Sequence, residues 1–242
     1  PPPAQIQLVD RSGAPLRTVR SASGPFNRPV TFAEVPPALA QATLAAEDKR
    51  FWSHPGVDWR GSLRAAGQLL RNRRIISGGS TITQQLVKIA QPRPRTFRSK
   101  LIEAFQALRL EQVWDKQRIL TEYLNRIDYG NLNNGCAAAA EFYYGKPLRD
   151  LSAAECALLA GLPQAPTRLN PVRHWESARK RQQWILGRML HNGALDADEY
   201  AMALAEALRP RTPYRAFEAP HFVDFLLHQW DNLVPETGGP TA

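Results

Sequence analysis

The sequence has few cysteines and no long apolar run, and both deficits narrow the class of protein. Two cysteines in 242 residues are too few for a disulfide framework. Cys136 and Cys156 also lack the spacing of metal ligands, and both stand in alanine-rich stretches, which favours buried thiols. No stretch of about 18 apolar residues and no signal peptide occurs. Either the protein is soluble, or a membrane anchor lies outside this chain.

Acidic residues are also in short supply, with 22 against 31 basic ones, so the formal net charge is +9. This excess favours anionic partners such as nucleic acid, acidic lipid headgroups or phosphorylated substrates. A soluble, arginine-rich protein without such a partner is the plain alternative. No helix-turn-helix, zinc-finger or aromatic RNA-binding pattern is present, so we expect no nucleic-acid partner.

Strand patterns are almost absent after residue 35, and the fold is predicted to be mainly α. A short β-hairpin is expected over residues 5–20, and a proline- and glycine-rich linker follows to residue 37. Three parts are expected: 1–37 as hairpin and linker, 38–208 as the main domain, and 209–242 as a further linker. Apolar periodicity predicts helices at 38–50, 60–74, 78–90, 97–114, 116–127, 135–143, 152–162, 174–191 and 196–207.

Three ordered motifs carry the candidate chemistry. The first, EDKRFWSHPG, spans residues 47–56 at the end of a predicted helix and begins with Glu47. A glutamate that follows an apolar helical turn can act as a general base, although an exposed helix-end glutamate is the ordinary alternative. Asp48 is expected to orient the local backbone.

The second motif, GGSTITQQLVK, spans residues 78–88 and suits an anion. A glycine pair lets the backbone approach a ligand, and the start of a helix presents free N–H groups. Helical spacing predicts Ser80, Gln84 and Lys88 on one stripe. A merely capped amphipathic helix is the alternative.

The third motif, SKLIE, spans residues 99–103 and adds Lys100 as a cation and Glu103 as a second carboxylate. A surface ion pair between residues three apart is the alternative for these two side chains.

Together the motifs resemble the signature of the peptidoglycan glycosyltransferases, glycosyltransferase family 51. Residues 116–130 and 158–166 resemble the fourth and fifth family motifs, so the resemblance spans about residues 38–190. The third family motif starts with arginine, where this chain has Ser99, and Arg98 stands one residue earlier. This relaxed motif and the wording of residues 162–171 resemble most the 1C type of bifunctional class A penicillin-binding protein.

The resemblance implies a lysozyme-like, mainly α fold with a head and a small membrane-proximal jaw, which would include the arginine-rich stretch 60–76. It implies polymerisation of lipid II into β-1,4-linked glycan strands, with inversion and release of undecaprenyl pyrophosphate. Glu47 is then the general base and Glu103 the second catalytic carboxylate, where Mg or another divalent cation could bind; no organic cofactor is expected. The implied substrate-binding side chains are those of Asp48, His54, Ser80, Thr81, Gln84, Gln85, Lys88, Arg98 and Lys100.

The expected partners are lipid II, the growing lipid-linked glycan and the membrane surface, with moenomycin as the expected inhibitor. The implied location is the outer, periplasmic face of the bacterial plasma membrane, with the anchor helix and a transpeptidase domain absent from this chain. Two alternatives stay open: a lysozyme-like or lytic glycan-cleaving enzyme, and a non-catalytic module that binds lipid II or peptidoglycan. A cationic pyrophosphate site around Lys88 and Lys100 argues against the first, and the presence of Glu47 and Glu103 argues against the second.

Overall fold

The computed structural model describes residues 5–13, 15–20, 29–59, 61, 80–94, 96–131, 133–211 and 222. The chain divides into two units, and the larger one is Asn27–Thr212. The other contains a hairpin of β1 (Gln5–Val9) and β2 (Pro15–Arg20), which confirms the predicted hairpin. Apart from Gly61, the predicted helix at 60–74, the expected jaw segment 60–76 and the glycine pair 78–79 lie outside the described residues.

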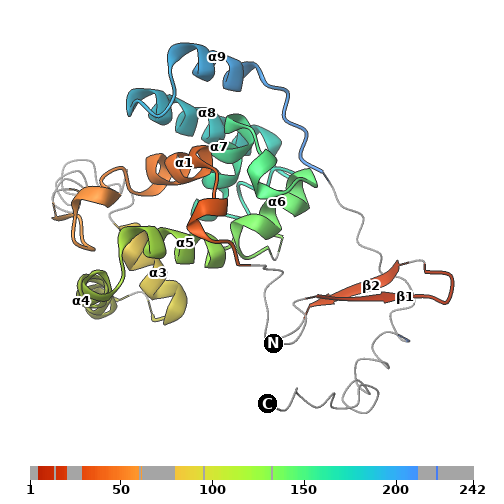
Figure 1. Cartoon of the computed structure of the whole chain (residues 1–242). Helices are drawn as coiled ribbons and strands as arrows, with labels where there is room; N and C mark the ends of the chain where they lie inside the picture. The colour runs from red at the N-terminus through yellow and green to blue at the C-terminus, as the bar shows by residue number, and fades with distance from the viewer. Residues whose placement is uncertain are drawn as a thin grey trace. The chain divides into compact units, whose positions relative to one another are not determined.

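The larger unit is built from helices (Figure 1). The predicted helices from residue 97 onwards match the observed ones within two residues. Short 3-10 turns lie at Phe32–Glu34, Phe51–Ser53, Leu148–Asp150 and Leu162–Gln164. The α-helices are α1 (Pro37–Glu47), α3 (Ile82–Ala90), α4 (Phe97–Val113), α5 (Lys116–Arg126), α6 (Cys136–Tyr144), α7 (Ala153–Gly161), α8 (Trp175–His191) and α9 (Ala197–Ala205).

Two helix ends differ from the prediction. Helix α1 stops at Glu47 rather than continuing to residue 50, because Asp48 has a non-helical backbone (φ −156°) and its side chain turns to other partners. Helix α3 starts at Ile82, since Thr81 is its N-cap and accepts a hydrogen bond from the Gln84 N–H. Ser80 therefore precedes α3, and the predicted stripe of Ser80, Gln84 and Lys88 along one helix is wrong.

Helix α7 is the centre of the core. Every residue from Ala154 to Gly161 is buried, and α1 and α8 pack against it (Figure 1). Its small side chains allow helices to approach on several sides at once. A capping box between Ser152 and Glu155 fixes its start, as predicted.

Both cysteines are buried and unpaired with each other, as predicted. Burial raises the pKa of the Cys136 thiol to about 12 and also raises the pKa of Cys156. The two thiols therefore stay protonated near neutral pH and serve as small apolar groups in the core.

Helix α3 packs against both α4 and α5, and the orientation of α4 departs from the prediction. The apolar spacing of residues 97–114 places Leu101 and Phe105 on one apolar face, which predicts that they are buried, but these side chains are 57% and 61% exposed. Helix α4 instead turns Ser99, Glu103 and Ala107 inward. We call Phe97, Leu101 and Phe105, which are spaced four residues apart, the apolar ridge of α4.

Candidate active site

Glu47 is the last residue of α1, and its side chain is only 15% exposed. Gln85 on α3 donates from Nε2 to Glu47 Oε2 at 2.9 Å. Tyr123 on α5 donates its hydroxyl to Gln85 Oε1 at 3.2 Å. Since the Gln85 amide is bonded at both ends, it holds the Glu47 carboxylate in one orientation. Gln85, predicted to bind substrate, thus contacts the predicted base.

Arg181 on α8 is the nearest cation that the structure places beside Glu47, with 3.9 Å between Nη2 and Oε1. Its side chain is 14% exposed and stacks on the Trp184 ring, with 4.3 Å to the ring centroid. Burial lowers the pKa of Arg181, and the charge of Glu47 opposes that shift. Arg181 was not predicted, because nothing in the sequence separates it from the other basic residues of α8.

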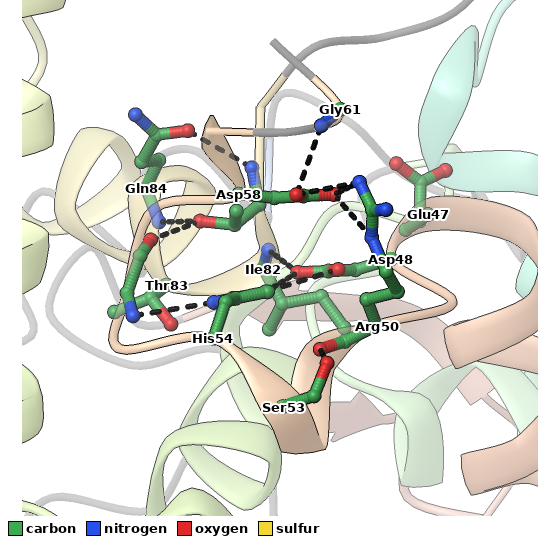
Figure 2. A network of polar contacts seen from close by, with 12 residues as sticks. Glu47, Asp48, Arg50, Ser53, His54, Asp58, Gly61, Ile82, Thr83 and Gln84 are labelled. Carbon is green, nitrogen blue, oxygen red and sulfur yellow. Dashed lines mark hydrogen bonds and ion pairs between the residues drawn. The ribbon is translucent and has the colours of Figure 1, made fainter.

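Asp48, next to Glu47, has a different environment. It is 7% exposed and accepts hydrogen bonds from His54 Nε2 at 2.9 Å and from the Ile82 N–H at 3.1 Å. Figure 2 shows this network, with the Glu47 side chain standing apart from it. Asp48 occupies the N-terminus of α3, where free N–H groups favour a carboxylate. It orients the backbone, as expected, and its oxygens are used within the protein.

His54 is buried, and both of its ring nitrogens have protein partners. The Gly56 N–H donates to Nδ1 at 3.2 Å, so the proton lies on Nε2, which donates to Asp48. The predicted substrate-binding role of His54 is therefore corrected to one within the protein. His54 instead closes the turn that follows Glu47.

Thr81 and Gln84 are also turned inward rather than towards a ligand. Their side chains form a capping box, in which Gln84 Oε1 accepts from the Thr81 N–H at 3.0 Å. Thr81 Oγ1 also donates to the Gly56 carbonyl at 2.6 Å, and both residues are buried. Their predicted role in substrate binding is corrected to one in fixing the start of α3.

Gly56 joins the loop after α1 to helix α4. Its φ is +98°, and a Cβ atom placed there would lie 2.6 Å from the Ala107 carbonyl oxygen. Only glycine allows this backbone to lie so close to the helix. The far end of the loop is fixed by Arg50, which pairs with Asp58 at 2.6 Å. Burial would raise the pKa of Asp58, but the hydrogen bonds from Arg50 and Gly61 outweigh it and lower that pKa.

An ion pair with one buried and one partly buried side chain supports the same loop. Lys116 Nζ contacts Glu111 at 2.7 Å, donates to the His54 carbonyl at 2.6 Å and lies 4.5 Å from the centroid of the buried Phe51 ring. Glu111 also accepts from Thr83 Oγ1 at 2.5 Å. The pair thus connects α4 and α5 to α3 and to the loop. Lys116 opens the fourth predicted motif, which is the only signal for this support in the sequence.

The second and third motifs meet at Lys100. Its Nζ donates to Ser80 Oγ at 2.7 Å and to Glu103 Oε2 at 2.9 Å. Lys100 is 52% exposed, whereas Glu103 is 5% exposed. The surface-pair alternative therefore fits Lys100 but not Glu103. An exposed ammonium held by a buried carboxylate and a hydroxyl is suited to an anionic group of a ligand.

The remaining predicted site residues are less confined. Lys88, in the last turn of α3, and Arg98, in the first turn of α4, are both exposed. Ser99 is buried, and its hydroxyl bonds to that of Thr96, the N-cap of α4. Within the described ranges, no three His, Cys, Asp or Glu side chains are grouped so as to hold a metal ion. A divalent cation at Glu103 stays a prediction, and no chemical step is assigned to it.

The profile of one protein family, described as Transglycosylase, matches residues 13–190. The chain belongs to the transglycosylase family. Its relatives include penicillin-binding protein 1A of Pseudomonas aeruginosa, 44% identical over 74% of this chain and 22% of the relative. Penicillin-binding protein 1C of Escherichia coli is 41% identical over 81% and 26% of the two chains. A putative transglycosylase of Cupriavidus necator is 42% identical over 75% and 79%.

This transglycosylase chain therefore spans only about a quarter of the length of its penicillin-binding relatives. Types 1A and 1C are both among them at similar identity, so the finer 1C assignment stays a prediction. The fold matches the crystal structure of penicillin-binding protein 1A from Haemophilus influenzae with a TM-score of 0.61. That match has 24% identity and covers 96% of this chain and 25% of the other, and it confirms the predicted helical fold.

Proposed function

We propose that this transglycosylase domain polymerises lipid II into β-1,4-linked glycan strands, with Glu47 as the general base. The observation that carries the proposal is the contrast between two adjacent carboxylates. Asp48 is fully engaged by His54 and the Ile82 N–H, whereas Glu47 accepts one hydrogen bond, at Oε2 from the Gln85 amide, and its Oε1 lies 3.9 Å from the Arg181 guanidinium. Of the two, Glu47 is the one whose carboxylate has the fewer hydrogen bonds within the protein, so we assign it the role of base.

In the proposed step, Glu47 takes the proton of the 4-hydroxyl of the acceptor sugar. The resulting oxygen attacks the anomeric carbon of the donor, the bond from that carbon to the pyrophosphate oxygen breaks, and undecaprenyl pyrophosphate leaves with the bonding electrons. Attack opposite the leaving group turns the α-linked donor into a β-linked product. Lys100, fixed by Glu103 and Ser80, supplies positive charge for the leaving pyrophosphate.

The contacts of Lys100 and of Glu47 favour this proposal over its two alternatives. A glycan-cleaving enzyme expels a neutral sugar hydroxyl and has no need of an exposed ammonium fixed by a buried carboxylate. A non-catalytic module has no need of a carboxylate oriented by a two-residue relay, as Gln85 and Tyr123 orient Glu47. The observed geometry thus supports transfer from a pyrophosphate donor.

We further propose that the domain works at the outer, periplasmic face of the bacterial plasma membrane, where its lipid-linked substrate is held. The apolar ridge of α4 supports this location, because Phe97 is 80% exposed and two more large apolar side chains follow it at helical spacing. The net charge of +9 favours an anionic surface. Among the described residues, no helix is long and apolar enough to cross a bilayer.

Polymerisation of fluorescent lipid II in detergent tests the function. We expect polymer from the wild-type chain, inhibition by moenomycin, and a loss of about 10²–10⁴-fold in rate for Glu47→Gln, which keeps the shape but not the base. Glu141→Gln, at an exposed glutamate of α6, is the matched control and should keep full activity. Equal rates for wild type and Glu47→Gln, or shortening of added glycan in place of polymer growth, would contradict the proposal.

A further inference from the structure

A groove of about 510 Å³ lies between α3 and α4 and is not used by the proposed chemistry. Its α3 side is formed by Leu86, Val87 and Ala90, whereas Gln85, which contacts Glu47, does not line it. The α4 side adds Leu110 and Val113, and Val113 is 78% exposed. The floor is therefore apolar. The polar lining residues are Gln91, Gln106, Arg109 and Arg126.

The polar residues around the groove give it a surplus of positive charge. Arg126 pairs with Glu122 one helical turn earlier on α5. Arg93 donates to the neutral side-chain amides of Gln91 and Gln106, at 2.7 Å each. Within the part of the chain that the structure describes, no carboxylate pairs with Arg93 or with Arg109. An apolar floor under a cationic rim is complementary to an anionic amphiphile.

The position of the groove indicates where such a molecule comes from. Arg109, which lines the groove, follows Phe105 by four residues, so the end of the apolar ridge at Phe105 lies next to the groove. The Arg109 guanidinium lies 6.0 Å from the Phe105 ring centroid, which connects the two features. A lipid surface in contact with the ridge therefore has the groove at its border.

We propose that the groove binds one anionic phospholipid. Its phosphate pairs with Arg109 and Arg126, and an acyl chain covers Leu86, Leu110 and Val113. Basic pockets at a membrane border are suited to such headgroups. The proposal rests on the proposed function only for the membrane location, since occupancy of the groove requires neither lipid II nor Glu47.

Titration calorimetry with dihexanoyl-phosphatidylglycerol below its micelle concentration tests the site in solution. We expect one bound molecule per chain, and binding at least tenfold weaker for the double variant Arg109→Gln/Arg126→Gln. The variant Ala90→Trp should abolish binding without changing any charge, because Ala90 lines the groove and a larger side chain would fill it. The double variant Arg149→Gln/Arg173→Gln removes the same charge at exposed positions elsewhere and should bind as wild type does.

Several results of this experiment would contradict the phospholipid site. No binding to wild type, or equal weakening by the two double variants, would overturn the proposal. Equal affinity for dihexanoyl-phosphatidylcholine would remove the role of the charge, and competition by inorganic phosphate alone would indicate a free-anion site. If circular dichroism shows that Ala90→Trp does not fold, the arginine double variant decides alone. Lipid II polymerisation without phospholipid binding would leave the proposed function standing and eliminate the groove.

Discussion

The loop from Asp48 to Asp58 and helix α4 use their side chains in opposite ways. In the loop, the side chains of Asp48, His54 and Asp58 form hydrogen bonds or ion pairs with neighbouring protein groups. On α4, large apolar side chains turn outward, and the Lys100 ammonium stands half exposed. The loop is thus built as a rigid support, whereas α4 is built as a surface for something else to contact.

This difference predicts that the stability of the fold depends more on the loop than on the apolar ridge of α4. Substitutions in and under the loop remove partners from buried charges, which is costly. Substitutions on the apolar ridge of α4 remove side chains that are mostly in contact with water. Stability and function should therefore respond separately in the two regions.

The strongest test of the loop as a support is Lys116→Met. This change leaves Glu111 buried without its ion-pair partner and removes the hydrogen bond to the His54 carbonyl. We expect the free energy of unfolding to fall by about 3–5 kcal/mol, measured by urea denaturation. Lys180→Met, at an exposed lysine of α8, should change it little. A fall of the same size in both variants would show that the Lys116–Glu111 pair is no special support of the loop.

A smaller effect is expected for Asp48→Asn. The amide keeps the shape but weakens the bonds to His54 and to the Ile82 N–H, which costs about 1–3 kcal/mol of unfolding free energy. Polymerisation should also fall, because Asp48 holds the backbone next to Glu47. Asp150→Asn is the control at an exposed carboxylate. An active and fully stable Asp48→Asn variant would show that the network is not a support.

The smallest effect on stability is expected on the ridge. The triple variant Phe97→Ser/Leu101→Ser/Phe105→Ser should change the unfolding free energy by no more than about 0.5 kcal/mol per site, because the side chains are mostly exposed. Its cosedimentation with phospholipid vesicles should nevertheless fall sharply. Met202→Ser, at an apolar side chain of α9 that is 66% exposed, should bind vesicles like wild type. Unchanged vesicle binding by the triple variant would show that the apolar ridge does not contact the membrane.

The sequence predicted the helices well because their signals are local. Apolar spacing defines α5 to α9 nearly to the residue, and the Ser152–Glu155 capping box fixes the start of α7 without any distant contact. Glu47 at the end of α1 and the Lys100–Glu103 pair were predicted in the same way, from helix ends and three-residue spacing.

The failures are those of side-chain direction, which depends on distant partners. His54 and Gln84 were predicted to bind a ligand, but His54 forms a hydrogen bond with Asp48, and Gln84 forms one with Thr81. Arg181 reaches Glu47 from 134 positions later in the chain (181 against 47), a proximity that only the packed core creates. The spacing of the apolar ridge of α4 predicts a buried helix face, because periodicity cannot show whether another element packs against it.

Gly56 has a consequence for how this domain can vary over generations. Any other amino acid at this position adds a carbon that meets the Ala107 carbonyl at 2.6 Å, in a backbone conformation that side chains rarely adopt. Every point mutation at Gly56 therefore creates this steric clash. Where the loop meets α4, no other amino acid is therefore expected to be neutral.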